Sequence, residues 1–371
     1  MQQKPYLDEI NDLKNTSRHY FAAANTYKGF RSFFDGIFDS RHLDRIYILK
    51  GGPGVGKSTL MKKAALSAEK KGFSPIQYHC SSDPKSLDGV LIEELGTAII
   101  DGTAPHTVDP YFAGAKEVIV NLGEAWDLAA LRKKSGEIVD ISEKKSDCYR
   151  TAYRMLSAAK SADDELSDMG RECTDLEKLH FAAGRFASKH LKGAPTGQKK
   201  QIVTDAISCD GRVRLFTPEK FSETLYFVKN VKNTASLFFE ELMAIAAKQE
   251  AQVCVGITPL DPERINCLYF PEISLCVSLY DDDFCKALEA SGRSYKVINT
   301  GRFFDSQAYR ARRQKYRFTE KCRDALMDEA VKSLEKAGEY HASLEEIYGR
   351  ATDYKKVSQI GNQVISELKL R

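Results

Sequence analysis

Short apolar runs alternate with segments of helical spacing along the first third of the chain. Residues 45–50 form an apolar run that ends at glycines, which predicts a buried strand. Residues 57–71 follow with Leu60, Ala64, Ala65 and Ala68 on one side of a predicted helix. Further strands are predicted at 74–80, 96–100 and 117–121. Strands that alternate with helices indicate an α/β fold, with a parallel sheet covered on both faces.

The pattern changes after this region. From Glu124 to about His190 the periodicity is helical, and the same change occurs again from Phe303. An α/β part is therefore followed by a long helical part, and this succession occurs twice.

The sequence also matches itself when its second half is laid over its first half at a nearly constant offset. The matching segments include 47–50 with 226–229, 83–84 with 261–262, 121–123 with 299–301, 130–132 with 308–310, and 174–175 with 352–353. A common offset over this length indicates an internal duplication. We expect a first domain at 1–191, a linker rich in Pro, Gly and Lys at 192–211, and a second domain at 212–371.

A glycine-rich segment lies between the first predicted strand and helix. It reads Gly51, Gly52, Pro53, Gly54, Val55, Gly56, Lys57, Ser58 and Thr59. Glycines let the backbone turn and approach phosphates closely, and successive amides together with the helix N-terminus then form an anion site. Lys57 can reach the β- and γ-phosphates, and Ser58 can bind Mg²⁺. The segment predicts a nucleoside triphosphate site, and each half is expected to be a P-loop NTPase-like three-layer α/β/α domain.

Two carboxylates are candidates for the remainder of this site. Asp101 ends a predicted strand and would join Ser58 at the magnesium ion; alternatively, it simply ends the strand. Gly102 follows it, so the usual adjacent base for activating water is missing. Asp83 lies just beyond another predicted strand, where the carboxyl ends of strands gather ligands. Glu93 and Glu94 could also orient a water, and no base is assigned at this stage.

One histidine and two arginines are further candidates for catalysis. His106 is expected in a loop near the γ-phosphate, as a phosphate sensor or proton carrier. Arg132 and Arg310 occupy equivalent places in the two helical parts, and either guanidinium could stabilise charge on the γ-phosphate. The simpler interpretation is that both arginines are solvated.

The second copy lacks the phosphate-binding residues. The segment that matches the glycine-rich loop is 230–237, and it contains no glycine and neither the lysine nor the hydroxyl at the matching positions. We therefore expect the second half to cover the first site, to supply a residue across the interface, or to bind a partner.

Composition narrows the function further. The net charge of +3 is small for 371 residues and gives no nucleic-acid signature, and no apolar run is long enough to span a bilayer. The nine cysteines include no C-x-x-C pair, which favours reduced thiols in a cytoplasmic protein. The chain contains no N-K-x-D motif for guanine and no L-S-G-G-Q motif of transporter ATPases, so ATP with Mg²⁺ is the expected ligand.

A resemblance rests on several segments: 21–26 before the first strand, 79–84, 86–88, 101–106 and 121–123. Together they resemble a family of bacterial ATP-binding proteins of unassigned function, built from two tandem P-loop halves. Its members usually carry a glycine-rich loop in both halves, and this chain departs from that in its second half. The resemblance implies ATP binding and an ATPase-like fold.

Three functions follow from these observations. The first is a slow or partner-stimulated ATPase, regulated by the degenerate second half. The second is a kinase for a small molecule or nucleotide, in which Asp83 would accept the acceptor proton. The third is a nucleotide-sensing scaffold without turnover. The partner, a small molecule or a protein, is not indicated by the sequence.

Overall fold

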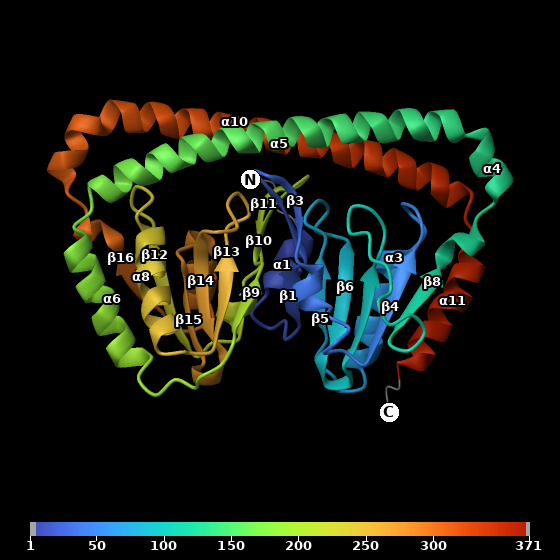
Figure 1. The fold of residues 1–371 in the computed structure, drawn as a ribbon, viewed down its shortest axis with the longest axis horizontal. Helices are drawn as coiled ribbons and strands as arrows, with labels where there is room; N and C mark the ends of the chain where they lie inside the picture. Colours follow the sequence, from blue (N-terminus) through green and yellow to red (C-terminus); the bar gives the residue numbers. More distant parts are fainter. Residues whose placement is uncertain (1–4, 369–371) are drawn as a thin grey trace.

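The computed structural model describes residues 5–368, and Figure 1 shows their arrangement. Two sheets stand side by side, and two long helices cross above both of them. The chain is an α/β protein with mixed sheets.

The first sheet has six strands, and their order is β1-β5-β6-β7-β4-β8. They are β1 (Arg18–Phe21), β4 (Arg45–Lys50), β5 (Ile76–His79), β6 (Leu87–Ile92), β7 (Thr97–Asp101) and β8 (Glu117–Asn121). Strand β6 runs antiparallel to both neighbours, and the other pairs are parallel. The prediction of a fully parallel sheet is therefore wrong. Short turns join β6 to β5 and β7, and only antiparallel neighbours can be joined in this way.

The second sheet repeats this pattern of pairing. From its β9 edge the order is β9-β13-β14-β15-β12-β16, with β14 antiparallel to both neighbours and the other pairs parallel. The strands are β9 (Lys199–Ile202), β12 (Thr224–Lys229), β13 (Val253–Ile257), β14 (Ile265–Phe270), β15 (Leu275–Leu279) and β16 (Lys296–Asn299). Strand β9 starts inside the stretch 192–211, so part of that stretch belongs to a sheet.

Smaller elements complete the two halves. The hairpins are β2 (Ala23–Thr26) with β3 (Gly29–Ser32) and β10 (Asp205–Ser208) with β11 (Gly211–Arg214). The short helices are α1 (Pro5–Asn11), α2 (Phe34–Ile37), α7 (Thr217–Lys220) and α9 (Asp282–Ala290), with 3₁₀ turns η1 (Glu93–Leu95), η2 (Leu122–Ala125), η3 (Pro271–Ile273) and η4 (Thr300–Phe303). A backbone bond from Phe21 N–H to Val203 C=O, 2.8 Å long, joins the two halves near β1 and β9.

The long helices are α5 (Ser135–Glu172) and α10 (Ser306–Arg350), and the short helix α4 (Leu128–Lys133) precedes α5. With 38 and 45 residues the long helices extend about 57 and 68 Å at 1.5 Å per residue. They run in opposite directions and share a core of alanine, leucine and methionine, which contains Ala152, Leu156, Ala159, Met327, Ala330 and Leu334. Within residues 5–368, no helix is both long and apolar enough to cross a membrane.

The helices that follow them are exchanged between the halves. Helix α6 (Leu176–His190) buries Ala183 and Ala187 in the core of the second sheet, beside α8 (Ala235–Lys248). Helix α11 (Tyr354–Glu367) buries Val357 and Val364 in the core of the first sheet, beside α3 (Lys57–Glu69). The terminal helix of each half therefore completes the core of the other half.

Candidate functional site

The glycine-rich segment connects β4 to α3 at the carboxyl end of the first sheet. Gly54 and Gly56 have φ angles of +68° and +101°, a conformation that side chains with a Cβ rarely adopt. The first amides of α3 find no carbonyl within their own helix, as at any helix N-terminus. The loop and the helix end therefore form a backbone that can bind an anion.

Lys57 lies inside this loop. Its Nζ donates hydrogen bonds to the carbonyls of Gly51 (2.7 Å) and Gly52 (2.9 Å), and it is 3.6 Å from Asp101 Oδ2. The side chain is 11% exposed, so the ammonium is held by the protein rather than by bulk water. A positive charge is thus fixed beside the glycine-rich backbone.

Asp101 and Ser58 are brought close to this lysine by neighbouring elements. Asp101 ends β7, and its register partner on β4 is Leu49, next to the start of the loop. Its Oδ1 accepts from the Thr103 N–H (2.9 Å). Burial raises the pKa of the Asp101 carboxyl, and Lys57 opposes the shift. Ser58 Oγ accepts a bond of 3.0 Å from the Leu87 N–H. A hydroxyl and a carboxylate are oxygen ligands suited to Mg²⁺.

His106 follows β7 in a loop, as expected, but its side chain is buried. Its Nε2 is 3.0 Å from Asp88 Oδ2, and its ring stacks on Phe34 with centroids 4.2 Å apart. Asp88 is buried as well. The structure therefore places His106 in a buried pair with a carboxylate. This position does not favour direct contact between His106 and the γ-phosphate.

Sequence reasoning missed Asp88 as a site residue. It lies on β6 in the run Leu87–Ile92, of which every residue is buried. Its charge raises the pKa of Asp101, so the two carboxylates interact. A charged residue inside an apolar run was the available signal, because a buried charge needs a partner.

Asp83 is positioned by its own turn near the loop. Its Oδ2 accepts a bond of 2.6 Å from Ser86 Oγ, and Oδ1 accepts from the Lys85 N–H (3.3 Å). Two of the carboxylate's lone pairs are therefore engaged within the turn.

The two candidate arginines lie at exposed positions on helices. Both Arg132, on α4, and Arg310, on α10, are exposed. Arg310 lies near the start of α10, whereas the part of α10 that touches the loop is close to the end of this helix of about 68 Å. The solvated interpretation fits both positions better.

The carboxyl-terminal end of α10 and the start of α11 cover the loop instead. A Cβ built on Gly52 would lie 3.1 Å from the Tyr348 ring, and one on Gly54 would lie 2.8 Å from the Glu345 carbonyl oxygen. Tyr354 Oη donates a bond of 3.0 Å to the Gly54 carbonyl. These contacts join segments from opposite ends of the chain, so no local pattern in the sequence could indicate them.

Charged groups from both long helices face the loop at this point. His341 Nε2 lies 3.7 Å from Glu345 Oε1 on α10. Burial raises the pKa of Glu345 and Asp83 adds to the shift, whereas the Gly54 amide, Lys57 and Lys145 oppose it. Burial also lowers the pKa of Lys145, on α5, and lowers that of His341 to about 4.

The loop between β12 and α8 in the second half is filled by its own contacts. Lys232 and Asn233 have positive φ angles of 51° and 62° without being glycine. Asn233 Nδ2 donates to Asp163 of α5 at 3.2 Å, and a Cβ on Gly170 of the same helix would lie 2.3 Å from the Lys232 carbonyl. The space beside this loop is therefore taken up by its own side chains and by helix α5.

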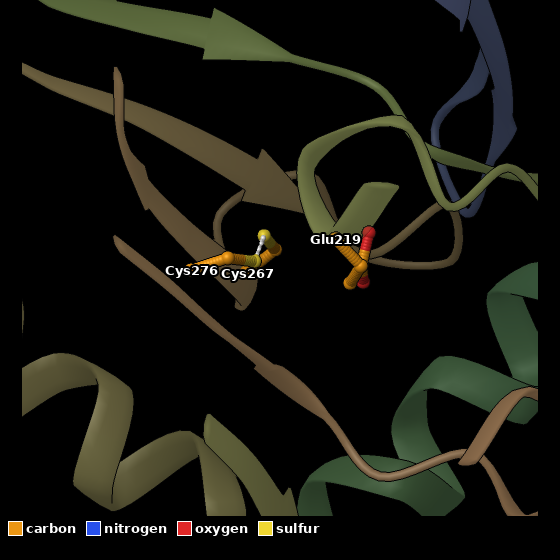
Figure 2. Close-up of side chains that lie close together, drawn as sticks. All are labelled: Glu219, Cys267 and Cys276. Carbon is orange, nitrogen blue, oxygen red and sulfur yellow. Dashed lines mark hydrogen bonds between the residues drawn. The ribbon is translucent and has the colours of Figure 1, made fainter. Parts of the chain in front are cut away.

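A second group of potential metal ligands lies in the second half and is drawn in Figure 2. Ligand atoms of Glu219, Cys267 and Cys276 lie within 4.8 Å of one another, and all three residues are buried. The two sulfurs are 3.6 Å apart. Glu219 is already paired with Arg214 at 3.0 Å, and burial raises the pKa of Cys276. Two buried thiols beside an internal ion pair account for this arrangement, and we assign no metal to it.

A scan against protein-family models and searches of the curated proteins and of the solved structures each returned no match.

Proposed function

We propose that this chain binds ATP with Mg²⁺ at residues 51–59 and hydrolyses it slowly or on stimulation by a partner. The observation that carries the proposal is Lys57, which lies within a glycine-rich loop between a strand and a helix, 3.6 Å from Asp101. This combination of backbone amides, one ammonium, one hydroxyl and one carboxylate suits a triphosphate and its magnesium ion. The resemblance to the bacterial ATP-binding family agrees with this proposal, and membership of that family stays a prediction.

We also infer that the two halves are duplicated P-loop NTPase-like domains. The shared offset that aligns residues 47–50 with 226–229 and 174–175 with 352–353 supports this inference. The equivalent order and direction of strands in the two sheets supports it independently. The second half is then a copy without nucleotide chemistry, whose helix α10 contributes to the first site.

Each group has a distinct role in the proposed reaction. Lys57 offsets negative charge on the β- and γ-phosphates, and its present carbonyl partners would be exchanged for phosphate oxygens. Ser58 and Asp101 would hold Mg²⁺, whose charge stabilises the leaving phosphate. The buried pair of Asp88 and His106 positions β6 beside Asp101.

Calorimetry with MgATP tests the binding step. We expect the wild type to bind and Lys57→Ala to lose at least about 10-fold in affinity, because the loop then lacks its charge. Lys62→Ala, in the same helix but with its Nζ on the Lys85 carbonyl, is the matched control and should bind as the wild type does. Wild-type protein that binds no MgATP would refute the proposal.

Labelled ATP separates hydrolysis from the other two functions. Release of the label as free phosphate supports the ATPase. Label retained on an added acceptor would indicate a kinase instead. Binding without any turnover would indicate a nucleotide-sensing scaffold.

A further inference from the structure

The residue that follows Asp101 cannot supply a carboxylate to activate water at the glycine-rich loop. The residue after Asp101 is Gly102, and a Cβ there would lie 2.3 Å from Ile48 Cγ2. The packing of β7 against β4 therefore leaves no room for a glutamate at the usual adjacent position.

Other acidic residues of the first half are engaged elsewhere. Asp83 accepts bonds within its own turn, and Asp88 forms the buried pair with His106. Glu93 and Glu94 lie beyond the far end of β6, which runs away from the loop because it is antiparallel. Glu93 is 2.9 Å from Arg18 there. Of the carboxylates considered from the sequence of this half, Glu93 and Glu94 are thus distant from the loop, and Asp83 already accepts hydrogen bonds from its own turn.

Glu345 reaches the loop from the second half. The backbone of α10 is in close contact with Gly54, since its Glu345 carbonyl lies 2.8 Å from a Cβ built on that glycine. Tyr354, just beyond α10, donates to the carbonyl of the same glycine, so this end of the helix is fixed on the loop. The Glu345 side chain is 48% exposed, and its carboxylate interacts with the backbone amide of Gly54 in the loop.

We propose that Glu345 is the general base of ATP hydrolysis at the glycine-rich loop. The inference rests on the proposed ATPase function. The Glu345 carboxylate accepts a proton from a water molecule while the water oxygen forms a bond to the γ-phosphorus. The bond from that phosphorus to the β–γ bridging oxygen breaks, and ADP leaves with the electron pair. Glu345 then releases its proton to solvent.

The surroundings of Glu345 suit this role. Lys57, Lys145 and His341 face the carboxylate from the loop, α5 and α10, and Asp83 faces it from the turn after β5. Burial and Asp83 raise the pKa of Glu345, which makes it a better proton acceptor than an ordinary glutamate.

The duplication offers an internal comparison. The alignment that places 174–175 opposite 352–353 places Glu345 opposite Ser167 on α5. Ser167 Oγ lies 3.5 Å from Asn233 Nδ2 of the degenerate loop. Of these two equivalent positions, only the one over the loop with the phosphate-binding residues carries a carboxylate.

Single-turnover hydrolysis and MgATP calorimetry on the full chain test the inference together. We expect Glu345→Gln to slow hydrolysis by about 100-fold or more, as for the loss of a general base, without weakening MgATP binding. Glu345→Asp, which keeps a carboxylate on a shorter stem, should retain part of the rate. Glu346→Gln is the matched control, because that exposed neighbour pairs with Arg350 one turn along the same helix.

Each alternative outcome is informative. An unchanged hydrolysis rate in Glu345→Gln would overturn the inference. If MgATP also bound more tightly to this variant, the carboxylate would merely compete with phosphate for the loop. Bound ATP that the wild type never hydrolyses would also overturn it. A wild type that does not bind MgATP would refute the proposed function itself, and these results are distinguishable in the same experiment.

Discussion

At the scale of single residues, glycines decide how closely two distant segments approach. Gly54 combines a positive φ with a backbone contact to α10, whereas Gly72 has a positive φ of 86° and open space around its Cβ position. Alanine substitutions at Gly54 and Gly72 would both strain the backbone, but only the substitution at Gly54 would also displace a helix.

We predict that Gly54→Ala lowers MgATP affinity at least about 10-fold and destabilises the protein by more than about 2 kcal/mol, because the new Cβ adds a collision with Glu345 to the strain. Gly72→Ala, the control, should cost about 1 kcal/mol through strain alone and leave affinity unchanged. Calorimetry and urea denaturation measure the two effects. Equal losses of affinity in both variants would contradict the role given to the α10 contact.

At the scale of elements, strands β1 and β5 are joined by a buried histidine pair. His19 Nδ1 lies 2.9 Å from His79 Nε2, and His79 Nδ1 lies 2.7 Å from the Pro84 carbonyl. A bond from His79 Nδ1–H to that carbonyl leaves Nε2 as the acceptor for His19, so both rings are neutral. Burial lowers the pKa of His19 to about 3 and that of His79 to about 4.

These pKa values predict that acid weakens the strand pair. Between about pH 6.5 and 4 the unfolded histidines bind protons that the folded ones do not, so stability is full above pH 6.5 and falls as the pH decreases. Each histidine contributes up to about 1.4 kcal/mol per pH unit. The free energy of unfolding, measured in urea at pH 7, 6 and 5, should fall less steeply in His79→Gln than in the wild type. His42→Gln, at an exposed position, should keep the wild-type slope; equal slopes in all three proteins would contradict the prediction.

Much of the element pattern was predictable from sequence. The expected strands at 45–50 and 117–121 coincide with β4 and β8, and the helix from Lys57 is confirmed with its end at Glu69. Strand β6 was missed, although its six residues are all buried, because a short apolar run with Asp88 and Gly89 gives no clear period. Its antiparallel direction made the sheet mixed.

At the scale of the whole molecule, the halves are held together by exchanged helices. Helix α11 and the residue after it bring Val357, Val364 and Leu368 into the core of the first sheet. Burial of three such side chains stabilises by roughly 5 kcal/mol, which is comparable to the total stability of a small domain. The core around the first sheet therefore contains side chains from the end of the chain as well as from its first half.

We predict that residues 1–191 alone aggregate or fail to bind MgATP, because they lack the helices that cover α3 and the loop. Co-expression with 192–371 should restore a stable complex with wild-type affinity, since the cut falls between α6 and β9. Size-exclusion chromatography and calorimetry provide the measurements. An isolated, monomeric 1–191 with wild-type affinity would show that the exchanged helices are dispensable.

The sequence by itself determined the local pattern: the glycine-rich loop with Lys57 and Ser58, the carboxylate at the end of a neighbouring strand, and the absence of these loop residues from the matching segment 230–237. These features depend on adjacent residues and on strand and helix periods, which a sequence displays directly. The tertiary structure alone decided which helix covers the loop, that His106 is buried against Asp88, and that Glu345 rather than Arg310 reaches Gly54. The reason is that such contacts depend on the length and crossing of two helices of about 60 Å, which carry residues from one half onto the other.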